Sequence, residues 1–100
     1  MIARIWHGRV PADKADEYLA RMRAVALPDY RSTAGNAGAW CLTRADDDVV
    51  HFEMVTLWES IEAIRRFAGD DETVAKYYDF DDDFLVEREP TVRHYDAYDT

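Results

Sequence analysis

Residues 50–78 read VHFEMVTLWESIEAIRRFAGDDETVAKYY, and this stretch decides the fold. Its first part is an apolar, β-forming run that ends at Trp58, and Ser60 is a suitable N-cap for a helix that begins directly behind it. Two adjacent tyrosines, Tyr77 and Tyr78, follow a second, shorter helical piece. The stretch predicts a strand that passes into a helix, with a large aromatic side chain at the rim of a sheet–helix cleft, where ligand sites often form.

Outward from this stretch, the hydrophobic pattern predicts three more strands and one more helix. The expected strands are residues 2–10, 38–44, 49–58 and 91–98. Apolar residues at helical spacing predict a first helix that Asp13 caps and that Pro28 should break or kink, and Asp71 can cap the short piece that ends near Tyr77. The order strand, helix, strand, strand, helix, strand predicts an α+β fold of the ferredoxin-like split βαβ type (β-α-β-β-α-β) with a four-stranded antiparallel sheet.

The composition indicates a folded single domain over residues 1–100, because 48% of the residues are hydrophobic and 13% are aromatic. The formal charge of −9 argues against nucleic acid and anionic membranes as partners. No apolar run approaches the roughly 20 residues that span a bilayer, and no apolar leader is visible. The one cysteine, Cys41, has no partner for an internal disulfide, so we expect a reducing, cytoplasmic location.

A four-stranded sheet with both helices on one face leaves its other face bare, and a second copy of the chain could cover it. We therefore expect a homodimer. On the first strand, alternation places Ala3, Ile5 and His7 on one face, which we expect to meet the helices. The residues expected on the bare face are Arg4, Trp6, His51, Glu53, Val55 and Leu57.

The segment LWES (57–60), followed by AIRRFAGDD (63–71), resembles the antibiotic biosynthesis monooxygenase family of the dimeric α+β barrel superfamily. IARIWHGRV (2–10) and EPTVRHYDAY (89–98) fit the first and last strands of the same unit, so the resemblance covers nearly the whole chain. It implies a dimeric α+β barrel and a small cofactor-independent monooxygenase that acts on an aromatic, polyketide-like small molecule. In such relatives a phenolic or anthrone-like substrate is deprotonated to an electron-rich anion that reacts with dioxygen itself.

The same resemblance implies a pocket between sheet and helices. The candidate catalytic residues of the sequence are Trp58, His7, Tyr77, Tyr78 and His94, and alternation does not decide which face His94 occupies. Trp58 could stack on a flat substrate, or it could be a core residue that pins the second helix to the sheet. One of the two tyrosines should face inward and could bond a substrate oxygen, or it could only cover the edge of the core. His7 or His94 could act as a general base, although a lone core histidine is often simply hydrogen-bonded.

Three other functions stay open. A haem-binding or haem-degrading protein needs an axial histidine, which residues 61–79 lack, so His7 or His94 would have to replace it. A non-enzymatic metabolite-binding dimer would use the same fold without chemistry. An oxygen-independent isomerase or cyclase would use it with different chemistry, because a fold does not fix a function.

The sequence does not predict a metal or a cofactor. Its histidines and Cys41 lack the local spacing of zinc ligands. The acidic run at residues 79–83 begins like a calcium loop, but Phe84 and Pro90 stand where that loop needs glycine and glutamate. We expect this run to be a solvated loop over the mouth of the pocket.

Overall fold

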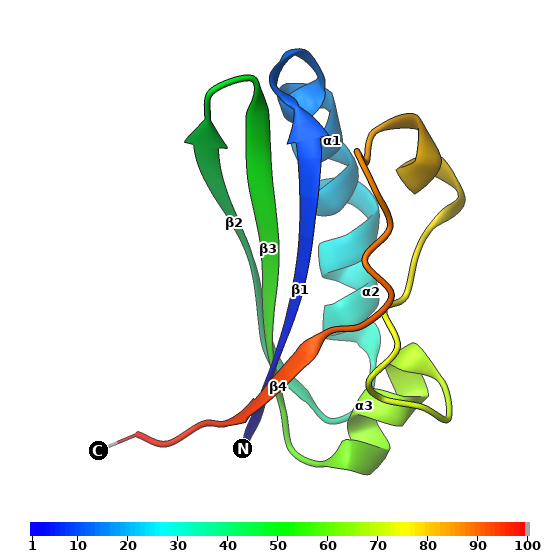
Figure 1. The fold of residues 1–100 in the computed structure, drawn as a ribbon. Helices are drawn as coiled ribbons and strands as arrows, with labels where there is room; N and C mark the ends of the chain where they lie inside the picture. The colour runs from blue at the N-terminus through cyan, green and yellow to red at the C-terminus, as the bar shows by residue number, and fades with distance from the viewer. Residues whose placement is uncertain (100) are drawn as a thin grey trace.

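The chain builds an α+β fold around one sheet. The structure is a computed structural model that describes residues 1–99, so the last residue of the predicted domain lies outside the described part. The strands are β1 (Ile2–Pro11), β2 (Asn36–Asp46), β3 (Val49–Trp58) and β4 (Arg93–Asp96). They pair antiparallel in the order β2-β3-β1-β4 (Figure 1). The predicted four-stranded antiparallel sheet is confirmed, and the arrangement is compatible with a ferredoxin-like fold.

Two helical regions lie on one side of the sheet (Figure 1). The first is a continuous helical rod made of α1 (Ala15–Arg21), the π-helical η2 (Met22–Ala26) and α2 (Leu27–Ser32), behind the single 3-10 turn η1 (Ala12–Lys14). Pro28 does not end this rod; it follows the π-helical η2 by two residues and lies in the first turn of α2. The second region is α3 (Ile61–Ala68), which Ser60 caps as predicted. No helix within residues 1–99 is long and apolar enough to cross a membrane.

The rod buries a stripe of residues at a strict spacing of four. The stripe consists of Tyr18, Met22, Ala26 and Tyr30. An α-helix advances 100° per residue, so a period of four drifts by about 40° at each step. The π-helical turns of η2 wind less tightly and reduce this drift. The whole stripe therefore faces the sheet, and both tyrosines reach the core.

The faces of β1 are the reverse of those predicted. Trp6 lies opposite Met54 and His7 opposite Glu53, and residues that lie opposite one another share a face. Trp6 and Met54 are buried beneath the helices, whereas His7 and Glu53 face the open side. The prediction that His7 faces the helices is therefore wrong.

The reversal has a physical reason in the composition of the two faces. Trp6 and Val10 together bury more apolar surface than Ala3 and Ile5 could, and hydrophobic burial scales with that surface. Arg4 shares the face of Trp6 and is carried inward with it. The placement of Arg4 and Trp6 on the bare face is thus also wrong, while that of the β3 residues on it agrees with the structure.

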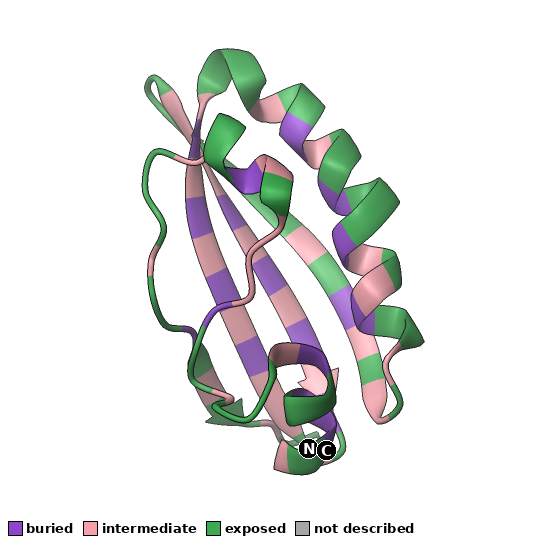
Figure 2. Ribbon diagram, turned by 90° about the vertical axis from the view of Figure 1, so that its right-hand side faces the viewer, coloured by how far each residue is buried: buried purple, intermediate pink, exposed green. Residues whose placement is uncertain are grey.

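Residues 70–92 form a segment that we call the strap. It leaves α3, rises beside the rod, turns through the short 3-10 helix η3 (Asp79–Asp83) and returns along β1 to β4 (Figures 1 and 2). The predicted short helix ending near Tyr77 is absent from it. Backbone bonds join its two arms, from Ala75 N to Pro90 O at 3.0 Å and from Val92 N to Thr73 O at 2.9 Å. The strap covers the part of the inner sheet face that the helices leave open.

The open face of the sheet carries half-exposed apolar side chains. On β2, Trp40 is 49% exposed and Leu42 is 52% exposed. Val55 lies opposite Trp40 and Glu53 lies opposite Leu42, so the four side chains share this face.

Two glycines with positive φ provide a matched test of how closely α3 packs. Gly35 has φ 91° and a Cβ added to it would lie 2.4 Å from Ala63 Cβ, whereas Gly69 has φ 99° and open space around it. Gly69→Ala should cost about 1–3 kcal/mol of unfolding free energy through backbone strain alone. Gly35→Ala should cost about 1–3 kcal/mol more because α3 must also move. Urea unfolding followed by circular dichroism measures both, and equal losses would contradict the close packing.

Candidate functional site

A small cavity lies between the sheet, the helical rod and the strap. Its volume is about 10 Å³, which is close to the space of one water molecule. It is lined by Trp6, Tyr18, Met22, Ala26, Tyr30, Met54, Lys76, Tyr78 and Asp81. Most of this lining is aromatic or apolar, and the charged groups come from the strap. Its place between sheet and helices is the place at which the sequence analysis expected a ligand pocket.

Asp29 on α2 holds two strap side chains at the rim of the cavity. Its Oδ2 accepts hydrogen bonds from Lys76 Nζ at 2.8 Å and from the Tyr78 hydroxyl at 2.6 Å. Burial raises the pKa of Asp29, but these two hydrogen bonds together outweigh it and leave that pKa below its ordinary value. Burial and the bond to Asp29 raise the pKa of Tyr78 far above its ordinary value. Asp29 is therefore an ionised acceptor, and Tyr78 keeps its proton.

Asp81 organises the strap above the cavity. It is buried in η3, where it accepts hydrogen bonds from the Tyr18 hydroxyl and from Tyr78 N, each at 2.7 Å. Burial and this contact raise the pKa of Tyr18 far above its ordinary value. The acidic run thus lies over the cavity as expected, but Asp81 is not solvated. Phe84 is buried beside it and anchors the run.

Trp58, the first predicted site residue, lies outside the cavity lining. It is fully buried, and its Nε1 donates a hydrogen bond to Thr56 Oγ1 at 2.8 Å. Its ring packs against Tyr30 and Phe67, with ring centres 6.4 Å and 5.8 Å away. This is the position of a core residue that joins α3 and the rod to the sheet.

The two predicted tyrosines occupy different positions in the strap. Tyr78 lines the cavity, while the Tyr77 hydroxyl donates a hydrogen bond to Glu89 O at the edge of β1. The ring of Tyr77 meets the edge of Trp6 with centres 6.2 Å apart. Tyr78 is thus the member of the pair that faces inward.

His7 belongs to a row of four side chains on the open face. Glu89 Oε2 lies 2.5 Å from His7 Nδ1, His7 Nε2 lies 2.8 Å from His51 Nδ1, and His51 Nε2 lies 3.1 Å from Asp46 Oδ2. The sheet separates His7 from the cavity. Through Glu89 the row ties the end of the strap to the open face.

His94 lies on the cavity side of the sheet. It is opposite Arg4 in the β1–β4 pair, so the two side chains share the helix-facing side. Burial lowers the pKa of His94, and the charge of Arg4 lowers it further. Its Nε2 is buried without a hydrogen-bond partner among the described residues. The structure thus leaves His94 as the neutral base candidate on this face and removes His7 from it.

Several side chains of this candidate site were not predicted from the sequence as site residues. They are Arg4, Trp6, Tyr18, Asp29, Lys76 and Asp81. Arg4 and Trp6 could have been found by pairing β1 with β3 in the sequence. In that pairing Trp6 lies opposite Met54, which belongs to the apolar face of β3, and Arg4 is on the same face as Trp6. The spacing of Tyr18 and Tyr30 in the sequence could also have predicted that both lie on one buried stripe of the helix. The partners of Asp29 come from a segment far away in the sequence and carried no signal.

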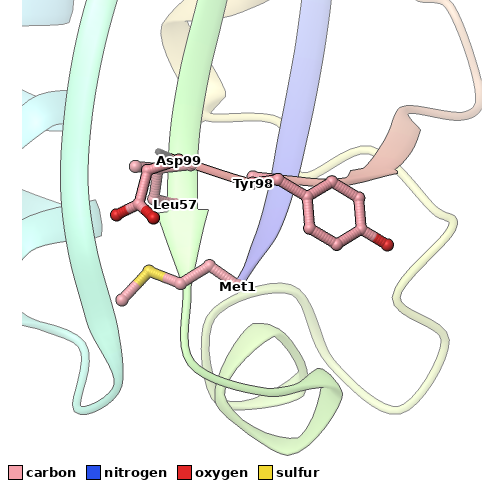
Figure 3. Close-up of a pocket in the computed structure, with 5 residues that line it drawn as sticks. Met1, Leu57, Tyr98 and Asp99 are labelled. Carbon is pink, nitrogen blue, oxygen red and sulfur yellow. The ribbon is translucent and has the colours of Figure 1, made fainter.

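A larger hollow of about 340 Å³ lies at the end of the sheet where the chain ends meet. Met1, Leu57, Ala97, Tyr98 and Asp99 line it, and Figure 3 shows the Tyr98 ring pointing away from the other labelled side chains. Among these lining residues, no group of polar side chains points toward a common point in the hollow. Nowhere in residues 1–99 do three or more histidine, cysteine or acidic side chains group as metal ligands.

No protein-family model matches this chain, and no curated protein matches it significantly. The family resemblance of the sequence therefore stays a prediction.

The Asp29 contacts predict how firmly the strap is closed. Asp29→Ala removes the acceptor of both Lys76 and Tyr78, which should lower the local stability of the strap by about 1 kcal/mol after allowance for solvent screening. Cleavage within residues 70–92 under limited proteolysis should then become about fivefold faster. Asp79→Ala is the matched control, because it removes an exposed carboxylate of the strap that makes no hydrogen bond to any of residues 1–99. Equal cleavage of both variants would contradict the closing role of Asp29.

His94 predicts a pH dependence of stability. Its pKa is lower in the folded protein than its ordinary value of 6.5, so the unfolded chain binds the proton more readily. The resulting stability is present above pH 6.5 and is lost as the pH falls. Between pH 7.5 and pH 5.5 the free energy of unfolding in urea should fall less for His94→Gln than for the wild type, because the variant lacks the His94 titration. His7 and His51 remain in both proteins. Equal losses would contradict the burial of a neutral His94.

Proposed function

We propose that the protein binds a small aromatic molecule between the sheet and the helical rod, and that it acts there as a cofactor-independent monooxygenase. The observation that carries this proposal is the aromatic cavity, which is closed by a strap rather than by a helix. Flat aromatic ligands suit a lining of this kind, because aromatic rings stack on one another and exclude water.

Binding requires the strap to move, since about 10 Å³ holds no more than one water molecule. The contacts of Asp29 with Lys76 and Tyr78 are the polar closure that must open. Displacing the strap would merge the cavity with the space beneath Arg4 and His94, because all of these lie on the same face of the sheet. After closure the site would be dry, which favours reaction of a carbanion-like substrate with dioxygen.

The proposed chemistry needs a base, an oxyanion donor and dioxygen. Neutral His94 takes a proton from the methylene or hydroxyl of an anthrone-type quinol and leaves an electron-rich anion. The anion supplies the electrons for dioxygen. One oxygen atom replaces the two methylene hydrogens as a carbonyl, and the other leaves as water. Tyr78 serves as a donor rather than a base, because it keeps its proton, and its single O–H would turn from Asp29 to the substrate oxygen.

The functional unit that we propose is a homodimer that pairs the open faces of two sheets. Trp40, Leu42 and Val55 supply apolar contact area, and the row from Glu89 to Asp46 supplies polar contacts. Half-exposed aromatic and aliphatic side chains on one continuous face favour such a partner over water.

Dioxygen consumption tests the proposed reaction. Metal-free protein given an anthrone-type quinol should consume dioxygen well above a buffer blank, and Tyr78→Phe should lower kcat about 100-fold because an oxyanion donor is lost. Tyr98→Phe is the matched control, since Tyr98 is 89% exposed and outside the cavity. Consumption no faster than the blank would reject the oxygenase and favour a binding protein or an oxygen-independent isomerase.

Analytical ultracentrifugation tests the dimer. Wild-type protein should sediment as a dimer, and Trp40→Glu should shift it to the monomer because a charge enters the apolar contact. Val25→Glu, which changes a side chain 37% exposed on the rod, should leave the dimer intact. A wild-type monomer at micromolar concentration would refute the assembly.

A further inference from the structure

Three buried side-chain nitrogens of the described residues lack a hydrogen-bond partner, and all three lie on one face of the sheet. They are Arg4 Nε, Trp6 Nε1 and His94 Nε2. Trp6 is two residues from Arg4 on β1, so both side chains point to the helix side. His94 lies opposite Arg4 on β4. Because buried polar groups are nearly always hydrogen-bonded, such a cluster calls for an explanation.

Arg4 is the most costly member of the cluster, because it is a buried charge. The residue is 1% exposed. Its Nη2 donates a hydrogen bond to Val74 O in the strap at 3.1 Å, and the side chain of Tyr30 also lies beside its guanidinium. Its guanidinium carbon lies 5.5 Å from the centre of the Phe67 ring. No carboxylate of residues 1–99 forms an ion pair with Arg4. A buried cation without an anionic partner is strongly unfavourable.

The two acidic groups of the cavity region are occupied by other donors. Asp29 accepts from Lys76 and Tyr78, and Asp81 accepts from Tyr18 and from a backbone N–H. Neither forms an ion pair with Arg4. The chain thus keeps a guanidinium beneath the strap whose Nε has no hydrogen-bond partner among residues 1–99.

We propose that Arg4 and Trp6, with His94 beside them, form an anion-binding site for an aromatic molecule that carries a carboxylate or phenolate oxygen. Arg Nε–H and the indole N–H can only donate hydrogen bonds, so they require an acceptor oxygen. A guanidinium prefers an anionic acceptor and can bind it through two parallel bonds. The site would be reached when the strap, which contacts Arg4 through Val74, opens.

This inference rests on the ligand cavity of the proposed function but requires no oxidation. In that reaction, Arg4 and Trp6 would hold the oxyanion that forms when His94 removes the proton. A protein that binds an aromatic anion at Arg4 without consuming dioxygen would reject the oxygenase and retain the anion site.

The test compares an anionic ligand with its neutral analogue by nitrogen–proton NMR in 150 mM NaCl, which screens the overall charge of −9. Salicylate should move the Trp6 Nε1–H and Arg4 Nε–H signals, and salicylamide should move them less than one-tenth as far at equal concentration. The indole signals of Trp40, on the open face, and Trp58, bonded to Thr56, are internal controls that should not move. Equal shifts with both compounds, or no shift with either, would overturn the proposal.

Arg4→Met separates a binding role from a structural one. The variant removes an unpaired buried charge and keeps most of the side-chain volume, so the urea midpoint of the free protein should rise or stay equal. Salicylate should bind at least tenfold more weakly, and Arg4→Lys, which retains the charge, should recover part of the affinity. A lower urea midpoint together with unchanged salicylate affinity would show that Arg4 serves the fold alone and would overturn the proposal.

Discussion

The register between β1 and β3 is the constraint on which the rest of the structure depends. β1 is a central strand, bonded to β3 on one side and to β4 on the other. Since side chains alternate along a strand, burying Trp6 and Val10 under the rod forces Arg4 inward and His7 outward. A single choice of face thus places a guanidinium in the core and separates the row of histidines from the cavity.

The strap then completes an interior that the helices alone do not close. α3 is short, so the inner faces of β1 and β4 are covered by residues 70–92 instead of a second long helix (Figure 2). This cover is fastened by side chains at its middle, where Asp29 holds Lys76 and Tyr78, and by Glu89 near its end. The rod and the sheet are joined by buried aromatic residues. The strap contributes buried apolar residues such as Phe84 and Val92 to the same core and adds the polar contacts of Asp29 and Glu89.

Sequence patterns predicted the parts of this structure that depend on local order. The bounds of β3, the Ser60 cap and the antiparallel sheet were predictable because they follow from periodicity and capping chemistry. The faces of β1 were not, because both of its alternating sets contain apolar and polar residues, and only the pairing with β3 decides between them. Within the candidate site, alternation did not decide the face of His94, and helical spacing did not decide between Tyr77 and Tyr78; the structure places His94 and Tyr78 on the cavity side of the sheet. The contacts of Asp29 and Asp81 join distant segments, which periodicity does not encode.

Closure by the strap would have a kinetic consequence for the proposed ligand. Entry and exit would require the contacts around Asp29 to break and reform, so a conformational step would limit the exchange rate of the ligand. Under such gating, the association rate constant depends on the fraction of time that the strap is open and varies little with the affinity of the closed site. A tightly closing strap would make ligands bind slowly and remain bound for a long time.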